Sequence, residues 1–171
     1  MFKKNKENPI LRSECSYEGV NVDTTILSML TLLENHFVQD IAEVLVEADN
    51  DNLRVIHGYM GVKTEIGELI DAYKKSWFYQ KELDEVNILE EVFDILWYVE
   101  VLEEELETTM YSTRHLLNEF AKLYNKDLDF CTKMGIEKLK IRYPDKYTDD
   151  YANERDLKAE RELLESSVKG D

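Results

Sequence analysis

The sequence predicts an all-α bundle of four or five helices, and three observations support this class. Only six Gly and two Pro occur in 171 residues, and both prolines lie near the ends, at Pro9 and Pro144. Apolar residues through the middle of the chain recur at steps of three and four, which is the period of an amphipathic helix. No segment stands out as a β-strand. The apolar content of 43% is enough to fill the core of one domain.

The first two helices are predicted at residues 23–47 and 53–79, separated by a polar break. Asp23 is suited to cap the first of them, because a short acidic side chain accepts from the free N–H groups of the first turn. The second helix contains three glycines, and each interior glycine costs roughly 1 kcal/mol relative to alanine. We therefore expect another helix or a ligand to approach closely there. These glycines are Gly58, Gly61 and Gly67.

The later helices are predicted at residues 87–124 and 128–140. The β-branched pair Thr108-Thr109 is a plausible bend within the first of these. Residues 158–165 are charged and are interpreted as an exposed helix whose end frays. The predicted organisation is an amino-terminal extension, one helical domain and a charged carboxy-terminal helix or tail, at residues 1–22, 23–156 and 157–171.

Charge and composition exclude several functions. The formal charge is 21 − 37 = −16, which repels nucleic acid and anionic lipid surfaces, so we expect neither as a partner. No apolar run approaches the roughly 20 residues of a membrane span, and residues 1–8 are not followed by the apolar core of a signal peptide. We therefore expect a cytoplasmic protein with two reduced thiols, Cys15 and Cys131. An acidic protein can still bind a small polyanion through divalent cations.

Two pairs of acids stand out by their surroundings. Glu65/Glu68 and Glu91/Asp94 are each three residues apart, so each pair shares a helix face, and each lies among apolar and aromatic neighbours. A carboxylate near a core needs a partner. The spacing itself is weak evidence, because the chain has other acid pairs with it. These are Glu82/Glu85, Glu100/Glu103, Glu104/Glu107 and Glu162/Glu165.

If the second and third helices pack antiparallel, the four acids can face one another as an oxygen cage for one to three Mg²⁺ ions. The alternative is that they are solvated or paired with lysines such as Lys63, Lys74 and Lys75. A di-iron bundle is disfavoured, because no histidine has a glutamate three residues before it. No phosphate loop of the G-x-x-x-x-G-K-[ST] type is present either.

Residues 57–75 (HGYMGVKTEIGELIDAYKK) and 78–99 (FYQKELDEVNILEEVFDILWYV) resemble the MazG-like nucleoside triphosphate pyrophosphohydrolases, a superfamily that also includes the all-α dUTPases. Its pattern is E-x-x-E, a variable spacer and E-x-x-D, and the spacer here is 91 − 68 − 1 = 22 residues. The resemblance resumes at residues 137–144 (EKLKIRYP), which is similar to a carboxy-terminal motif of small members, including many encoded by phages.

The resemblance implies an enzyme of nucleotide metabolism that cleaves a nucleoside triphosphate to the monophosphate and pyrophosphate. Glu65, Glu68, Glu91 and Asp94 would bind Mg²⁺, for which Mn²⁺ can substitute, and Glu68 would orient or deprotonate the attacking water. A homodimer or homotetramer is expected. The alternatives are an all-α dUTPase-type enzyme and a catalytically silent helical protein that serves oligomerisation or regulation.

Further residues are candidates for binding the phosphates or the base of the substrate. Candidates for phosphate binding are Lys74, Lys75, Lys81, Lys138, Arg142 and Tyr143, the last three from the later motif. Trp77, Phe78 and Trp97 either stack on a base or fill the core. Asp71 is either a fifth acid near the cage or a partner of Lys75.

The chain also departs from the family pattern at three positions. Phe93 replaces a glycine, Gln80 replaces a glycine in a Tyr-Gly-Lys loop, and Gly135 replaces an asparagine. Phe93 puts the substrate preference in doubt more than the chemistry.

Overall fold

The computed structural model describes residues 19–37, 53–146 and 148–170, and within them the chain forms seven helices and no strand. The all-α class is thus confirmed, with more helices than the four or five predicted. Their bounds are α1 Thr24–His36, α3 Leu53–Tyr79, α4 Glu85–Glu105, α5 Tyr111–Lys122, α6 Leu128–Arg142, α7 Asp149–Asn153 and α8 Leu157–Lys169.

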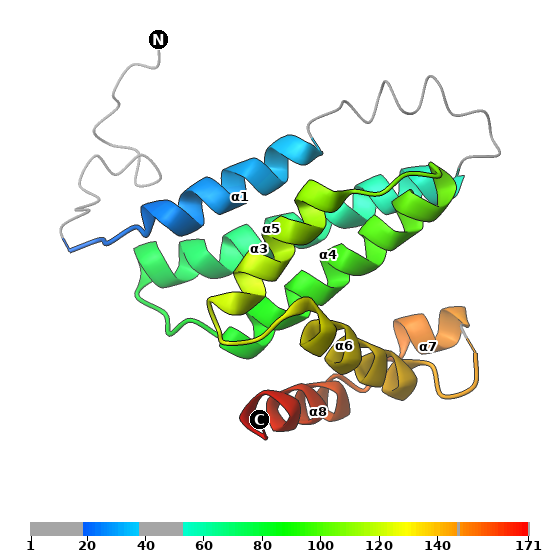
Figure 1. Cartoon of the computed structure of the whole chain (residues 1–171). Coiled ribbons are helices and arrows are strands. Elements are labelled where there is room, and N and C mark those ends of the chain that lie inside the picture. The colour runs from blue at the N-terminus through cyan, green and yellow to red at the C-terminus, as the bar shows by residue number, and fades with distance from the viewer. Residues whose placement is uncertain (1–18, 38–52, 147, 171) are drawn as a thin grey trace, which may run out of the picture.

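The two longest helices, α3 and α4, form an antiparallel hairpin that is the centre of the fold (Figure 1). A short loop joins them. Gln80, directly after α3, has a φ of 53°, a left-handed conformation that glycine adopts without strain. Gln80 is one of the three positions at which the sequence departs from the MazG-like pattern, and its backbone conformation is one that favours glycine.

Close packing of α3 on α4 explains two of the three glycines in α3. A Cβ atom at Gly61 would lie 2.3 Å from the Tyr98 ring, and one at Gly58 would lie 2.8 Å from Leu102. Both contacts are shorter than real Cβ atoms show, so the predicted close approach of a helix is confirmed at these positions. Among the described residues nothing lies within 4 Å of a Cβ placed on Gly67, so no helix packs closely there, and the approach of a ligand stays a prediction.

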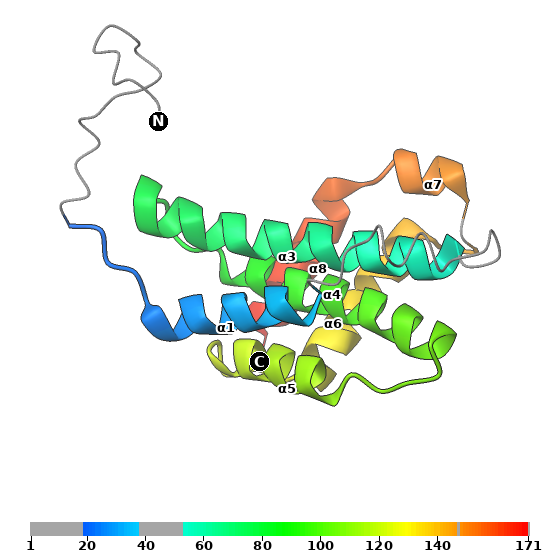
Figure 2. The ribbon, with the colours of Figure 1, turned by 90° about the horizontal axis from the view of Figure 1, so that it is seen from above.

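α1 and α5 cover one side of the hairpin (Figure 2). Asp23 caps α1 as predicted, because its carboxylate accepts from the backbone N–H groups of Thr25 and Ile26. α1 is described only to its end at His36, and the remainder of the helix predicted at 23–47 lies outside the described residues.

The helix predicted at 87–124 is two helices, with a break between Glu105 and Tyr111. Glu103 stabilises the loop between the two helices, because its carboxylate accepts from the backbone N–H of Met110 at 2.6 Å and from the guanidinium of Arg114. The predicted bend at Thr108-Thr109 therefore falls in the right place, but it reverses the chain direction instead of bending one helix.

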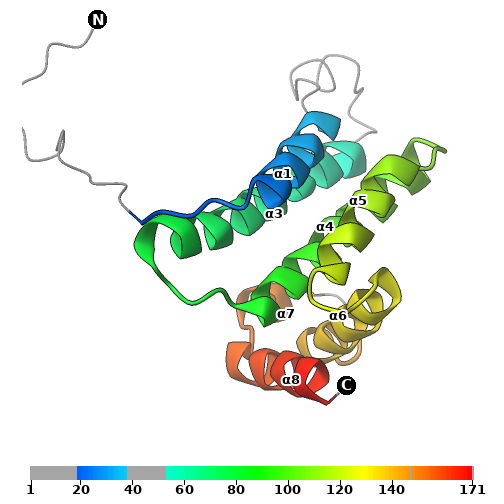
Figure 3. The same ribbon diagram turned by 60° about the vertical axis from the view of Figure 1, so that its left-hand side comes forward.

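α6 and α8 pack together across the other side of α4 (Figure 3). The helix predicted at residues 158–165 is confirmed as part of α8, but the expectation that it is exposed is wrong, because α8 buries Glu160 and Leu164 and contacts both α6 and α4. The buried face of α8 forms a wall of the site described below. Among the described helices, none combines the length and apolar character needed to cross a membrane.

Candidate metal and substrate site

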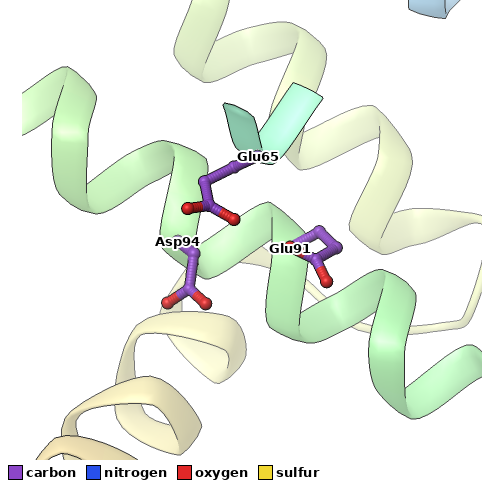
Figure 4. Close-up of side chains that lie close together, drawn as sticks. All are labelled: Glu65, Glu91 and Asp94. Carbon is purple, nitrogen blue, oxygen red and sulfur yellow. The ribbon is translucent and has the colours of Figure 1, made fainter. Parts of the chain in front are cut away.

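The hairpin of α3 and α4 brings together three of the four predicted ligands. Glu65, Glu91 and Asp94 each offer a carboxylate oxygen, and these oxygens lie within 4.8 Å of one another. Figure 4 shows Glu65 reaching across from α3 toward Glu91 and Asp94 on α4. The antiparallel packing across the 80–84 loop places the acids of one helix opposite those of the other.

Glu68 lies beside this cluster but not within its tightest group. It lines the same cavity as Glu65, Glu91 and Asp94. Its charge also raises the pKa of both Glu65 and Glu91, so it is close enough to act on them electrostatically. The four predicted acids thus share one site, with Glu68 one helical turn further along α3 from Glu65.

The carboxyl groups of the cluster are close together and partly buried, which disfavours their ionised forms. Glu91 is 4% exposed, and burial, followed by the charges of Asp94, Glu68 and Glu65, raises its pKa to about 9. Burial together with Asp94 and Glu68 also raises the pKa of Glu65, although a hydrogen bond with Glu91 works in the opposite direction. Carboxyls in this state hold protons near neutral pH unless a cation replaces those protons.

Lys138 supplies one positive charge to the cluster from α6. Its side chain is fully buried, and its ammonium donates to both oxygens of Asp94 at 2.7 and 2.8 Å and to Glu90 at 3.1 Å. The sequence suggested that Lys138 contacts phosphate. In this conformation it does not line the cavity, because its ammonium is held on Asp94 and Glu90.

The acids line one side of a cavity of about 1080 Å³ that lies between α3, α4, α6 and α8. Ligand pockets for small molecules are typically about 300 to 1,000 Å³, so a nucleotide fits this space. Of the predicted phosphate-binding residues, Arg142 and Tyr143 line the cavity. The indole of Trp97 also lines it and is 46% exposed.

The three remaining lysines lie away from this cavity. Lys74 and Lys75 pair with Asp71, so of the two alternatives for Asp71 the ion pair with Lys75 is confirmed. Lys75 and Lys81 line a second, smaller cavity of about 440 Å³, which Glu68 also borders. Lys74 lines neither cavity.

The other two aromatic candidates are not part of the main cavity. Trp77 packs on the core against the ring of Tyr73, with the ring centroids 5.5 Å apart. Phe78 is 42% exposed near the end of α3 and does not line the main cavity. Trp97 is therefore the only one of the three aromatic candidates placed to meet a ligand there.

Two departures from the family pattern contact each other. A Cβ atom at Gly135 would lie 2.1 Å from the Phe93 ring, so the backbone of α6 rests directly on that ring. Phe93 adjoins Asp94 in α4, and Lys138 follows Gly135 by one helical turn in α6. The Phe93–Gly135 contact therefore lies next to the ion pair of Lys138 with Asp94.

Several site residues were missed by the sequence reasoning. Glu90 was not singled out although it directly precedes Glu91, and it binds Lys138. Glu160 and Arg161 also line the cavity, but they belong to the segment 158–165 that was interpreted as exposed, and Arg155, which lines it too, was not singled out. The available signal was the helical spacing within this segment. Leu164 lies one turn after Glu160, so the two share a helix face, and the apolar residue indicates that this face is buried.

The geometry defines a helical protein with a shared carboxylate cluster at the edge of a nucleotide-sized cavity. No family model matches the chain. Comparisons with curated proteins and with solved structures also found no significant match.

Proposed function

We propose that the chain is a Mg²⁺-dependent nucleoside triphosphate pyrophosphohydrolase that acts in the cytoplasm. The observation that carries the proposal is the convergence of Glu65, Glu91 and Asp94 within 4.8 Å, with Glu68 beside them in one cavity. The MazG-like resemblance at these residues supplies the reaction class.

The donor set fits a hard divalent cation. All the converging atoms are carboxylate oxygens, which Mg²⁺ and Mn²⁺ prefer. Lys138 gives one positive charge to a cluster of five acids that includes Glu90. The raised pKa values of Glu65 and Glu91 indicate that this one charge does not balance the negative charge of the acids. Bound Mg²⁺ would polarise the phosphate oxygens and lower the pKa of a bound water.

The chain's own residues then have distinct tasks. Glu65, Glu91 and Asp94, with Glu68 beside them, would hold the metal. Glu68 would also orient a water and accept its proton. A bond forms from the water oxygen to the α-phosphorus, the bridging bond between the α- and β-phosphates breaks, and pyrophosphate leaves with the bonding electrons. Trp97 offers an exposed aromatic face in the cavity for the nucleoside.

The test is a panel of ribo- and deoxynucleoside triphosphates, including dUTP, each with Mg²⁺ or EDTA. We expect Mg²⁺-dependent formation of monophosphate and pyrophosphate, with oxygen from ¹⁸O-labelled water found in the monophosphate. Diphosphate plus phosphate as products would overturn the assignment to the α-phosphate. Activity confined to dUTP would favour a dUTPase-type enzyme, and no activity would favour a silent helical protein.

Glu68→Gln tests the role of one side chain. We expect a loss of kcat of at least about 100-fold, the usual scale for a general base, with the fold retained. Glu162→Gln is the matched control, because Glu162 belongs to an E-x-x-E pair on α8 and its side chain is 70% exposed. Equal activity of Glu68→Gln and the control would remove Glu68 from the mechanism.

The proposal includes a homodimer or homotetramer, which would add core to a 20.2 kDa chain. Multi-angle light scattering at micromolar concentration measures the mass directly. A strict monomer would contradict this part of the proposal and leave the reaction untouched.

A further inference from the structure

Four cationic side chains line the main cavity from α6, α8 and the segment before α8. They are Lys140, Arg142, Arg155 and Arg161, and one acid, Glu160, lies among them. This grouping is notable in a chain with a formal charge of −16. Lys140 pairs with Glu137, and Arg161 pairs with Asp84 and Glu165, so the charges left to attract an anion are those of Arg142 and Arg155.

Two of these cations share one buried carboxylate. Glu160, whose side chain is 3% exposed, accepts from Arg142 at 2.7 and 3.1 Å and from Arg155 at 2.6 and 3.4 Å. Each guanidinium uses two of its five N–H groups on Glu160. Despite the effect of burial, the two arginines lower the pKa of Glu160 to about 2, so the carboxylate stays ionised and the group of three carries a net charge of +1.

Glu160 has a bidentate partner even without Arg155, because Arg142 binds both of its carboxylate oxygens. α8 is also held by Arg161, which binds Asp84 at the start of α4 and Glu165 within α8. Arg155 therefore adds a positive charge beyond the pairing of Glu160 with Arg142, and it places that charge at the cavity.

We infer that Arg142 and Arg155, held side by side by Glu160, form a subsite for the terminal phosphates of the substrate. This inference rests on the proposed function and extends it to a residue outside the family-like motifs. The phosphate chain would run from the carboxylate cluster to the two guanidiniums, whose planar N–H groups suit phosphate oxygens. There they neutralise charge on the pyrophosphate that leaves.

The test uses Arg155→Gln and a control of equal charge change, Lys169→Gln. Lys169 is on α8, is paired with Glu165 and does not line the cavity. In steady-state kinetics with Mg²⁺, we expect Arg155→Gln to raise KM for a triphosphate at least about tenfold, the scale of one lost charge-assisted contact. The control should leave KM unchanged. Arg155→Lys, which keeps the charge, should recover part of the loss.

Direct binding separates this inference from the proposed reaction. Inorganic tripolyphosphate is titrated calorimetrically into each variant, with Mg²⁺ and with EDTA. If no nucleotide is hydrolysed but Arg155→Gln weakens tripolyphosphate binding at least tenfold relative to Lys169→Gln, the subsite stands and the reaction fails. If hydrolysis occurs and Arg155→Gln, folded by circular dichroism, keeps the wild-type KM and tripolyphosphate affinity, the subsite is overturned and the reaction stands.

Discussion

Replacing Glu91 by glutamine should make the metal-free protein more stable at neutral pH, although it removes a predicted metal ligand. Burial and the neighbouring acids raise the pKa of Glu91 to about 9, so the folded protein keeps this carboxyl protonated at pH 7. In the unfolded chain the same carboxyl ionises near its ordinary pKa of 4.5. Glutamine is neutral in both states, so the variant lacks the stabilisation that ionisation of Glu91 gives to the unfolded chain.

The size of the effect follows from the linkage between proton binding and folding. Between pH 4.5 and the raised folded pKa, the folded state holds the extra proton, so the wild-type free energy of unfolding falls as the pH rises, by about 1.4 kcal/mol per pH unit. From pH 4.5 to 7 the loss reaches up to about 3 kcal/mol. The advantage of Glu91→Gln should therefore be up to about 3 kcal/mol at pH 7 and less than about 1 kcal/mol at pH 5.

Urea unfolding in EDTA at pH 5 and pH 7 measures this difference, with the exposed Glu162→Gln variant as the control. In Mg²⁺ the wild type should gain more free energy of unfolding than Glu91→Gln does. A ligand that binds only the folded state adds stability, and Glu91→Gln binds the metal more weakly. The reasoning is refuted if Glu91→Gln is no more stable than wild type at pH 7 in EDTA, or if its gain is the same at both pH values.

Two further predictions concern the family departures. Gly135→Ala should destabilise the fold by about 1–3 kcal/mol, because its Cβ meets the Phe93 ring at 2.1 Å, and the cost should shrink in a Phe93→Leu background. A double-mutant cycle by thermal or urea unfolding measures the coupling, and additive effects would contradict the contact. Gln80→Gly should stabilise by about 1 kcal/mol, because Gln80 has a φ of 53°, and unchanged unfolding in urea would show that this turn is not strained.

The sequence predicted best what depends on local patterns. The bounds predicted for the second helix, 53–79, match α3, because a strong helical period ends at clear polar breaks. The convergence of Glu65, Glu91 and Asp94 also followed from local facts: two acids per helix face and a short loop that makes the two helices antiparallel. Both are properties of neighbouring residues.

Long-range pairings were beyond the same reasoning. The partner of Lys138 could not be predicted, because Asp94 lies 44 residues away and the pairing depends on how α6 crosses α4. The break before α5 depends on Glu103 and Arg114, which look like ordinary surface charges in the sequence. Arg155 was overlooked for the same reason, since its own charge gives no sign of what packs over it. For Glu160 the one local signal was the apolar Leu164 one turn later on the same helix face.

The ion pair between Lys138 and Asp94 affects the binding of a divalent ion at the carboxylate cluster. The ammonium is tethered to α6 and shielded from water, so it competes for Asp94 at a high effective concentration that dilution cannot lower. A divalent ion that binds Asp94 therefore competes with this ammonium for the carboxylate oxygens, which raises the ion concentration needed for occupancy. If the ion displaced the ammonium, the freed charge would lie one helical turn from the cavity-lining Arg142, close to the proposed phosphate subsite.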